Sequence, residues 1–132
     1  MGLAERRWAA DKKATDEVGY KQRIDALAGK EIALEIDWDA FSNQLSDSGY
    51  ISDGSYGIPQ LIKALEDITV DDLGKTALNE GLQRIVITPM PAGGESSFKF
   101  ENGVVTWVAY FGGSTQSYIY ADAMRSTLEQ GL

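Results

Sequence analysis

The stretch SSFKFENGVVTWVAYF, residues 96–111, decides the fold class. At its centre is Asn102-Gly103, a pair favoured in two-residue type I′ turns because both residues tolerate a positive φ. The flanking segments are rich in aromatic and β-branched residues, so the stretch predicts a β-hairpin. Segment 104–111 is apolar on both faces except at Thr106, and we expect a central strand covered on both sides.

Two further strands are expected before the hairpin. Segment 31–37, EIALEID, places its large aliphatic residues on one face and its carboxylates on the other, which is typical of a half-buried strand. Segment 84–90, RIVITPM, is β-branched and ends at prolines. The hairpin and these two segments together predict a sheet of about four strands.

The remaining chain is helical in character. Residues 3–28 are dominated by good helix formers, and Gly29 follows as a stop signal. A short helix with Trp38 on its apolar face, and helices over 59–68, 72–82 and 115–130, follow from apolar spacing.

The resulting order, α-β-α-α-α-β-β-β-α, predicts an α+β fold with a mainly antiparallel sheet and four or five helices. We expect one domain over residues 1–132, with 1–29 forming a long, partly basic N-terminal helix. If helices cover only one face of the sheet, the outer side of the hairpin needs a partner subunit or a ligand.

The chain contains neither cysteine nor histidine among its 132 residues. This excludes disulfides, thiolate or imidazole metal sites, and nucleophilic relays that depend on His or Cys. Catalysis would have to rely on carboxylates, Lys, Tyr, Ser, Thr or an oxygen-bound metal. The absence of His and Cys favours a binding protein over an enzyme without excluding carboxylate catalysis, and no catalytic residue or cofactor is predicted.

The net charge of −8 is unevenly distributed. Residues 1–30 contain seven Lys/Arg and five Asp/Glu, whereas the remaining chain contains five and fifteen. Such an acidic body disfavours nonspecific binding to nucleic acid or anionic lipid. No apolar run approaches the roughly 20 residues that span a bilayer, and the N-terminal segment is charged, so we expect a cytoplasmic protein.

The segment SDSGYISDGSYG, residues 46–57, is the strongest candidate for a contact surface. Tyrosine with Ser, Gly and Asp is typical of adaptable binding loops, and tyrosines recur at 50, 56, 110, 118 and 120. A slack linker is the alternative. A calcium loop is disfavoured because the spacing of Asp47 and Asp53 does not fit the EF-hand pattern.

Three other patterns have both a chemical and a purely structural interpretation. Asp37-Trp38-Asp39 has the DxD spacing of some metal-binding transferases, but a strand end followed by a helix cap explains it better. Glu35 and Asp37 share a strand face and could act as paired carboxylates if buried. The glycine-rich turn at 111–115 could bind an anion at a helix N-terminus, although a capped turn is simpler.

These observations favour a small acidic binding protein with a basic protein partner, or one that self-associates as a homodimer. An inhibitor or immunity-type protein is a concrete version. The alternative is a small-molecule-binding domain or a modest carboxylate enzyme with an aromatic pocket. The candidate ligand- or partner-binding residues are Trp38, Tyr50, Tyr56, Trp107, Tyr110, Tyr118, Glu35 and Asp37. No metal site, nucleic-acid partner or membrane partner is expected.

Overall fold

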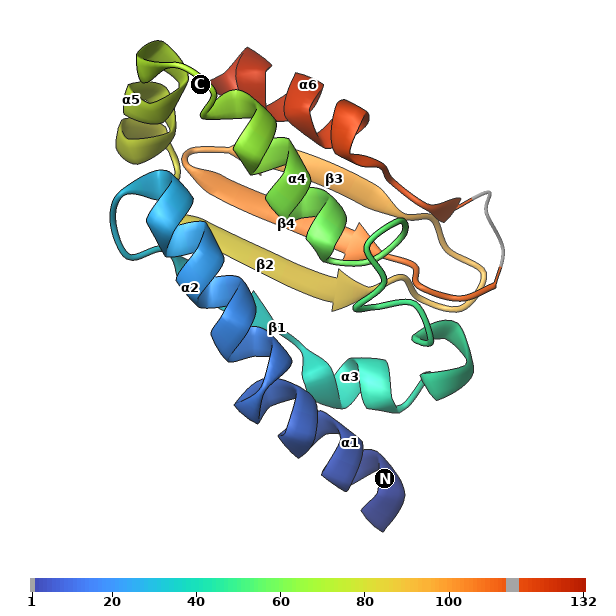
Figure 1. Cartoon of the computed structure of the whole chain (residues 1–132). Coiled ribbons are helices and arrows are strands. Elements are labelled where there is room, and N and C mark those ends of the chain that lie inside the picture. Colours follow the sequence, from blue (N-terminus) through green and yellow to red (C-terminus); the bar gives the residue numbers. More distant parts are fainter. Residues whose placement is uncertain (1, 114–116) are drawn as a thin grey trace.

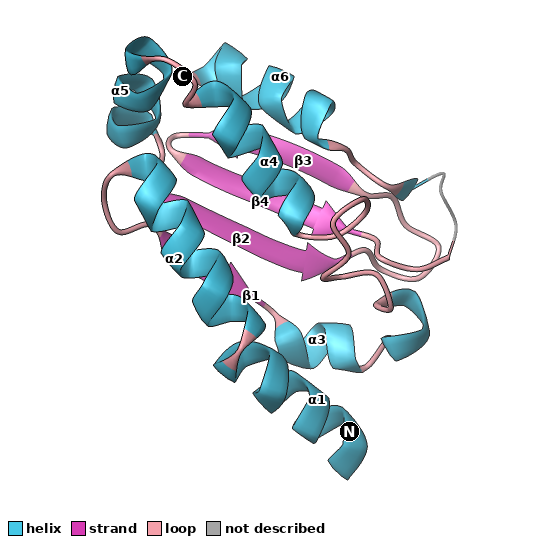
Figure 2. Ribbon diagram, in the orientation of Figure 1, coloured by secondary structure: helices cyan, strands magenta, loops and turns pink. Residues whose placement is uncertain are grey.

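A computed structural model describes residues 2–113 and 117–132 (Figure 1). Its helices are α1 (Leu3–Ala14), α2 (Asp16–Ala28), α3 (Trp38–Ser42), the short 3₁₀ helix η1 (Leu45–Asp47), α4 (Pro59–Ile68), α5 (Asp72–Gly81) and α6 (Ala121–Gly131). Its strands are β1 (Ala33–Ile36), β2 (Arg84–Pro89), β3 (Ser97–Glu101) and β4 (Val104–Ala109). The expected α+β class, the four-stranded sheet and the order of elements are confirmed (Figure 2).

The sheet is mixed, with strand order β1-β2-β4-β3. The β1–β2 and β2–β4 pairs are parallel and only β3–β4 is antiparallel, so the expectation of a mainly antiparallel sheet is wrong in this detail. The cause lies in the connections. Residues 37–83 carry helices that return the chain to the starting edge, which makes β1 and β2 parallel. The loop after β2 passes to the far edge, and β4 then returns between β2 and β3.

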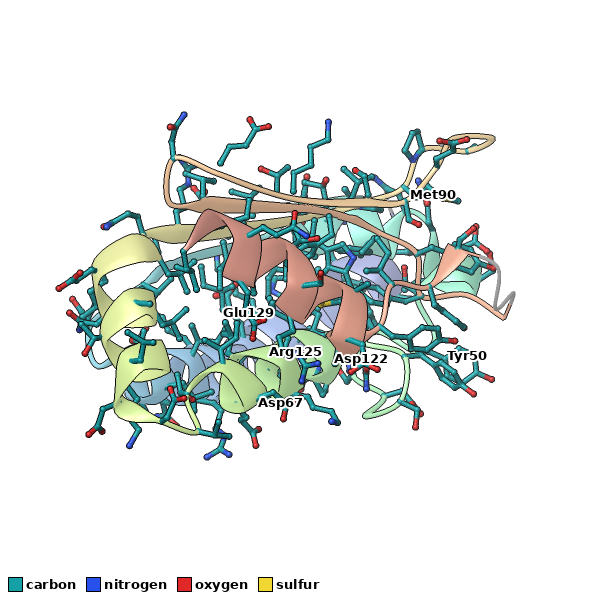
Figure 3. The ribbon with its side chains drawn as sticks, turned by 90° about the horizontal axis from the view of Figure 1, so that it is seen from above. Tyr50, Asp67, Met90, Asp122, Arg125 and Glu129 are labelled. Carbon is teal, nitrogen blue, oxygen red and sulfur yellow. The ribbon has the colours of Figure 1, made fainter. Side chains whose placement is uncertain are left out.

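Helices α2, α4 and α6 pack against one face of the sheet (Figures 1 and 3). The opposite face, here called the outer face, carries no helix of the described chain. It consists of exposed or half-buried side chains that alternate with the buried ones: Ala33, Glu35, Arg84, Val86, Thr88, Ser97, Lys99, Glu101, Val104, Thr106 and Val108.

The expectation that segment 104–111 is covered on both sides is therefore wrong. In β4, Val105 and Trp107 are buried, whereas Val104 and Val108 on the outer face are only half-buried. A valine fits a half-exposed strand position well, because its β-branch suits extended backbone even where burial is incomplete.

The core lies between the sheet and these helices. Trp107 is at its centre and contacts Phe98 and Phe111 edge-on, at ring-centroid distances of 6.2 and 5.4 Å. Leu61 and Leu65 on one face of α4 are fully buried, in agreement with the apolar spacing of the sequence.

Local signals explain most element boundaries. Asn102 and Gly103 both have positive φ, 53° and 79°, as the hairpin turn requires. Gly29 ends α2 with φ 71°. The expected N-terminal helix is divided into α1 and α2 at Thr15, the residue between them, whose ψ is −68°.

The last helix begins later than expected, at Ala121 rather than near residue 115. Ser114 and Thr115, the expected capping residues, lie outside the described residues. Because α6 begins well after Gly113, the glycine-rich turn does not lead directly into its N-terminus, and the anion-site hypothesis loses its basis. Over the described ranges, no helix has both the length and the apolarity needed to cross a bilayer.

Candidate contact surface

Segment 46–57 is tied into the fold by backbone hydrogen bonds. Tyr50 N donates to Phe111 O at 2.9 Å, and Phe111 N donates to Asp47 O at 3.2 Å. Ile58 N donates a hydrogen bond to Ile51 O at 2.8 Å, which closes the loop, and the Ile51 side chain is buried. The segment is therefore an ordered part of the carboxyl edge of the parallel strands, and the slack-linker alternative is excluded.

Side chains anchor the same loop to α4 and α6. Gln60 on α4 donates from Nε2 to Gly54 O at 2.8 Å, while its Oε1 accepts a hydrogen bond from the buried Ala121 N at 2.9 Å. One amide side chain thus joins the loop to the first residue of α6.

A second anchor reaches the junction of α1 and α2. Ser52 Oγ donates to Asp16 Oδ2 at 2.5 Å, and Lys12 Nζ lies 3.0 Å from the same carboxylate oxygen. Partial burial opposes ionisation of Asp16, but hydrogen bonds from Ser52, Lys12 and Thr15 outweigh it and lower the pKa of Asp16. Burial raises the pKa of the neighbouring Tyr20.

Five tyrosines meet beside this anchored loop. Tyr56 stacks on Tyr118 at 4.8 Å with an interplanar angle of 22°, and Tyr50 contacts Tyr56 edge-on at 5.7 Å. Tyr110 lies 5.7 Å and Tyr120 6.2 Å from Tyr118. These rings come from two segments that are distant in sequence, 50–56 and 110–120, and Tyr118 is at the centre of the cluster.

Contacts within the protein hold the tyrosine cluster, and two of its rings are exposed to solvent. Tyr118 Oη donates to Gly112 O. A Cβ on Gly112 would lie 2.6 Å from Tyr110 Cζ, so only glycine at position 112 allows the Tyr110 ring to pack against it. Tyr50 and Tyr120 keep 43% and 41% of their surface exposed. Desolvation, followed by the neighbouring phenols, raises the pKa of Tyr118.

The segments that carry the rings also carry carboxylates. Asp47 and Asp53 belong to the same loop as Tyr50 and Tyr56, and Asp122 follows Tyr120 at the start of α6. Figure 3 labels Tyr50 and Asp122. Residues 31–62 contain six Asp/Glu and no Lys or Arg, and residues 100–124 contain no Lys or Arg either. We call the five tyrosines with these three aspartates the tyrosine edge.

Four of the predicted site residues lie elsewhere. Trp38 and Trp107 are core residues, 3% and 1% exposed. Trp38 Nε1 donates to Glu17 Oε1 at 3.1 Å. Glu35 is exposed and forms an ion pair with Arg84, and Asp37 is exposed and caps α3 by accepting from Ala40 N at 3.1 Å. Both carboxylates therefore have structural roles and do not form a buried acid/base pair.

Tyr120 was missed as a site residue by the sequence analysis. A helix beginning near 115 would separate Tyr118 and Tyr120 around the helix circumference. In the structure both precede α6, and their rings contact each other. The signal available in the sequence was the two-residue spacing of Tyr118 and Tyr120, because that spacing puts two side chains on one side of an extended chain.

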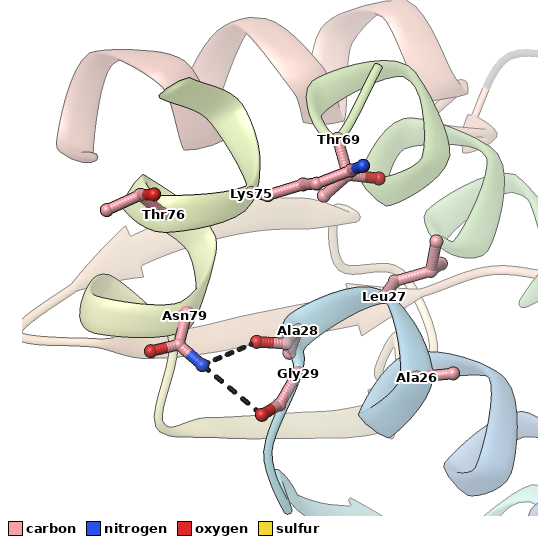
Figure 4. Close-up of a pocket in the computed structure, with 8 residues that line it drawn as sticks. All are labelled: Ala26, Leu27, Ala28, Gly29, Thr69, Lys75, Thr76 and Asn79. Atoms are coloured by element: carbon pink, nitrogen blue, oxygen red, sulfur yellow. Dashed lines mark hydrogen bonds between the residues drawn. The ribbon is translucent and has the colours of Figure 1, made fainter. Parts of the chain in front are cut away.

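One cavity lined by described residues differs in character from the tyrosine edge. A solvent-open cleft of about 520 Å³ lies between the end of α2 and α5 (Figure 4). Its Asn79 side chain is occupied, because Nδ2 donates to Ala28 O at 2.9 Å and more weakly to Gly29 O at 3.3 Å. Lys75 is the ionisable residue among those that line it, and no aromatic side chain contributes. No group of three or more carboxylates within the described ranges could hold a metal ion.

Comparison of the chain with protein-family models, with curated proteins and with solved structures finds no match. The function must therefore be argued from the tyrosine edge itself.

Proposed function

We propose that this protein binds a basic protein partner through the tyrosine edge. The observation that carries the proposal is the convergence of five partly exposed tyrosines, carried by segments that also contain Asp47, Asp53 and Asp122 and no Lys or Arg. The inhibitor or immunity-type version, in which this surface blocks a basic enzyme, is the most concrete form of the proposal.

The chemistry of the surface suits a cationic partner. A tyrosine face attracts Arg or Lys through its π electrons, and a phenol provides a hydrogen bond and a large contact area with few rotatable bonds. Flanking carboxylates add charge-assisted hydrogen bonds. The net charge of −8 would also accelerate encounter with a basic protein at low salt.

The anchoring of the loop supports the same proposal. The loop that carries Tyr50 and Tyr56 is held in place before any partner binds. The side chains of Gln60 and Ser52 anchor it, and backbone hydrogen bonds join it to Phe111. A preordered surface loses less conformational entropy on binding than a flexible loop. The aromatic-pocket alternative has less support. Trp107 is buried in the core, and the cleft of about 320 Å³ that Trp38 and Asp37 line contains no other aromatic residue.

An NMR titration tests the proposal with defined probes. The ¹⁵N-labelled protein is titrated with arginine-rich, lysine-rich and glutamate-rich peptides of equal length. We expect shifts in residues 46–57 and 110–122 with the basic peptides, strongest with arginine and weakened by salt. Shifts centred on the acidic residues of α5 instead, or equal shifts with the glutamate peptide, would contradict the proposal.

Two pairs of variants make the titration specific. Tyr50→Ala removes an exposed ring of the edge, and Leu73→Ala removes an exposed side chain of α5 as its control. Asp47→Asn removes a charge at the edge, and Glu80→Gln removes one on α5. Only the first member of each pair should weaken binding of the arginine-rich peptide.

A further inference from the structure

The outer face of the sheet has a charge pattern that can be read from the strand register. Glu35 pairs with Val86, Val86 with Thr106, and Thr106 with Lys99, so these four residues form one row across β1, β2, β4 and β3. Their sequence neighbours Ile36, Ile85, Ile87, Val105 and Trp107 are buried on the other side. The row therefore points outward, with a carboxylate at one end, an ammonium at the other and Val and Thr between them. The Glu35 carboxylate also forms an ion pair with Arg84 of its own chain on the same face.

The adjacent row repeats this arrangement with a shift. Ala33, Arg84, Val104 and Glu101 are aligned across the same four strands. Arg84 lies toward the β1 edge and Glu101 on the β3 edge, so the order of charges is opposite to that in the first row. Charges of both signs thus lie toward each side of the sheet, Glu35 on β1 with Arg84 on β2 and Lys99 with Glu101 on β3, and half-buried valines lie between them.

We infer that the outer face binds the outer face of a second copy of this chain, with the two-fold axis parallel to the strands. This operation places β1 over the partner's β3, and β2 over the partner's β4. Glu35 then faces the partner's Lys99, and Lys99 faces the partner's Glu35. Arg84 lies diagonally opposite the partner's Glu101, and valines and threonines of the central strands meet between the charged edges.

A two-fold axis perpendicular to the strands places β1 over the partner's β1 and β3 over the partner's β3. If this axis crosses the row of Glu35 and Lys99, each of these residues lies near its own copy, which brings like charges together. If it passes between the two rows, Lys99 faces the partner's Glu101 instead. Only the axis parallel to the strands pairs Glu35 with the partner's Lys99, and charge reversal at these two positions distinguishes the two axes.

The size of the face sets the expected strength. Four strands at about 4.8 Å spacing and six residues at about 3.3 Å give a footprint of roughly 400 Å² per subunit. A contact of this size belongs to the small, transient class of interfaces. We expect a dimer that forms at high micromolar to millimolar protein concentration.

Charge reversal with rescue in trans tests the inference by sedimentation equilibrium. Lys99→Glu converts two symmetry-related attractions into repulsions and should weaken self-association about tenfold. Glu35→Lys does the same and in addition removes the ion pair with Arg84 of its own chain, so it should weaken self-association at least as much. In an equal mixture of the two variants, positions 35 and 99 again carry opposite charges wherever one variant faces the other. The mixture should form heterodimers at least as readily as the wild type forms dimers.

Controls separate this contact from changes in net charge or folding. Glu80→Lys and Lys75→Glu make the same charge changes on exposed positions of α5 and should leave self-association close to that of the wild type. Thermal melts of every variant report folding. A wild type that stays monomeric up to millimolar concentration, single variants that still dimerise, or a mixture without heterodimer would each overturn the inference.

The axis direction has a consequence that rests on the proposed function. The tyrosine edge lies at the carboxyl ends of β1, β2 and β4, and a two-fold parallel to the strands leaves both copies at the same end of the dimer. The dimer would present two binding surfaces side by side. Because sedimentation uses no partner, its outcome is independent of the peptide titration.

Discussion

Gln60 is the side chain whose loss should most clearly uncouple the tyrosine edge from the rest of the fold. It is 9% exposed and makes two hydrogen bonds, one to Gly54 O and one from Ala121 N. Gln60→Ala removes both. Alanine favours helix at least as well as glutamine, so α4 itself should not suffer.

The magnitude follows from what each group does after the change. Ala121 N is buried and would lose its acceptor, which costs about 1–3 kcal/mol, whereas Gly54 is exposed, so its carbonyl can bond to water and loses about 0.5–1 kcal/mol. We expect a loss of about 1.5–4 kcal/mol in the free energy of unfolding. With an unfolding entropy of about 2.1 cal/mol/K per residue, this corresponds to a fall in Tm of roughly 5–14 °C.

Urea denaturation and thermal melts measure the loss, and hydrogen exchange locates it. Exchange at residues 50–58 and at Ala121 should accelerate more than in β2 or β4. Gln60→Glu keeps the acceptor for Ala121 N but loses the donor to Gly54 O, so it should lose less stability. Gln130→Ala on the exposed side of α6 is the control. A loss below about 1 kcal/mol for Gln60→Ala would refute the reasoning, because a buried donor without an acceptor must cost more.

Three further changes have defined outcomes. Gly103→Ala should cost about 1–2 kcal/mol in urea denaturation, because φ is 79° and a Cβ would lie 2.6 Å from Gln83 Cγ. The pKa of Asp16 is lower in the folded state than in the unfolded state, so Asp16 stabilises the fold at pH values above its unfolded pKa. This stabilisation is lost as the pH falls through the lower, folded pKa. The free energy of unfolding of Asp16→Asn should therefore depend less on pH in the acid range than that of the wild type. The raised pKa of Tyr118 means that the folded state retains its proton longer, so stability falls as pH rises above about 10, and Tyr118→Phe should reduce that fall. Absorbance titration at tyrosinate wavelengths checks this last prediction. The wild type should contain a phenol that ionises at higher pH than the others, and this phenol should be missing from Tyr118→Phe. If the two titration curves differ only by an ordinary phenol, the reasoning is wrong.

Local chemistry made the elements predictable. The Asn102-Gly103 turn, the alternation in 31–37 and the Pro59 helix start are all signals within a few residues, and each appears in the structure. The boundary of α6 was wrong because apolar spacing around Tyr118 imitates a helix, whereas its ring instead packs on Tyr56 and its phenol bonds to Gly112.

The sequence predicted that tyrosines would form the candidate site, but it did not predict which of the candidate residues would lie together. Tyr50, Tyr56, Tyr110 and Tyr118 meet as a group, but the tryptophans and the carboxylates of β1 do not join them. A tryptophan can serve equally as a core residue or a binding residue, and only its burial in the folded chain distinguishes the two roles.

The sequence by itself determined the α+β class, the order of elements, the acidic charge and the exclusion of His- and Cys-dependent chemistry, because these depend on composition and short-range pattern. Tertiary structure alone decided that the sheet is mixed, that one face is open, and that Tyr56 lies against Tyr118 and Tyr120 from the far end of the chain. Strand pairing and ring contacts join residues distant in the chain, and the free energy that selects among such pairings comes from burial of the whole core, which no single segment encodes.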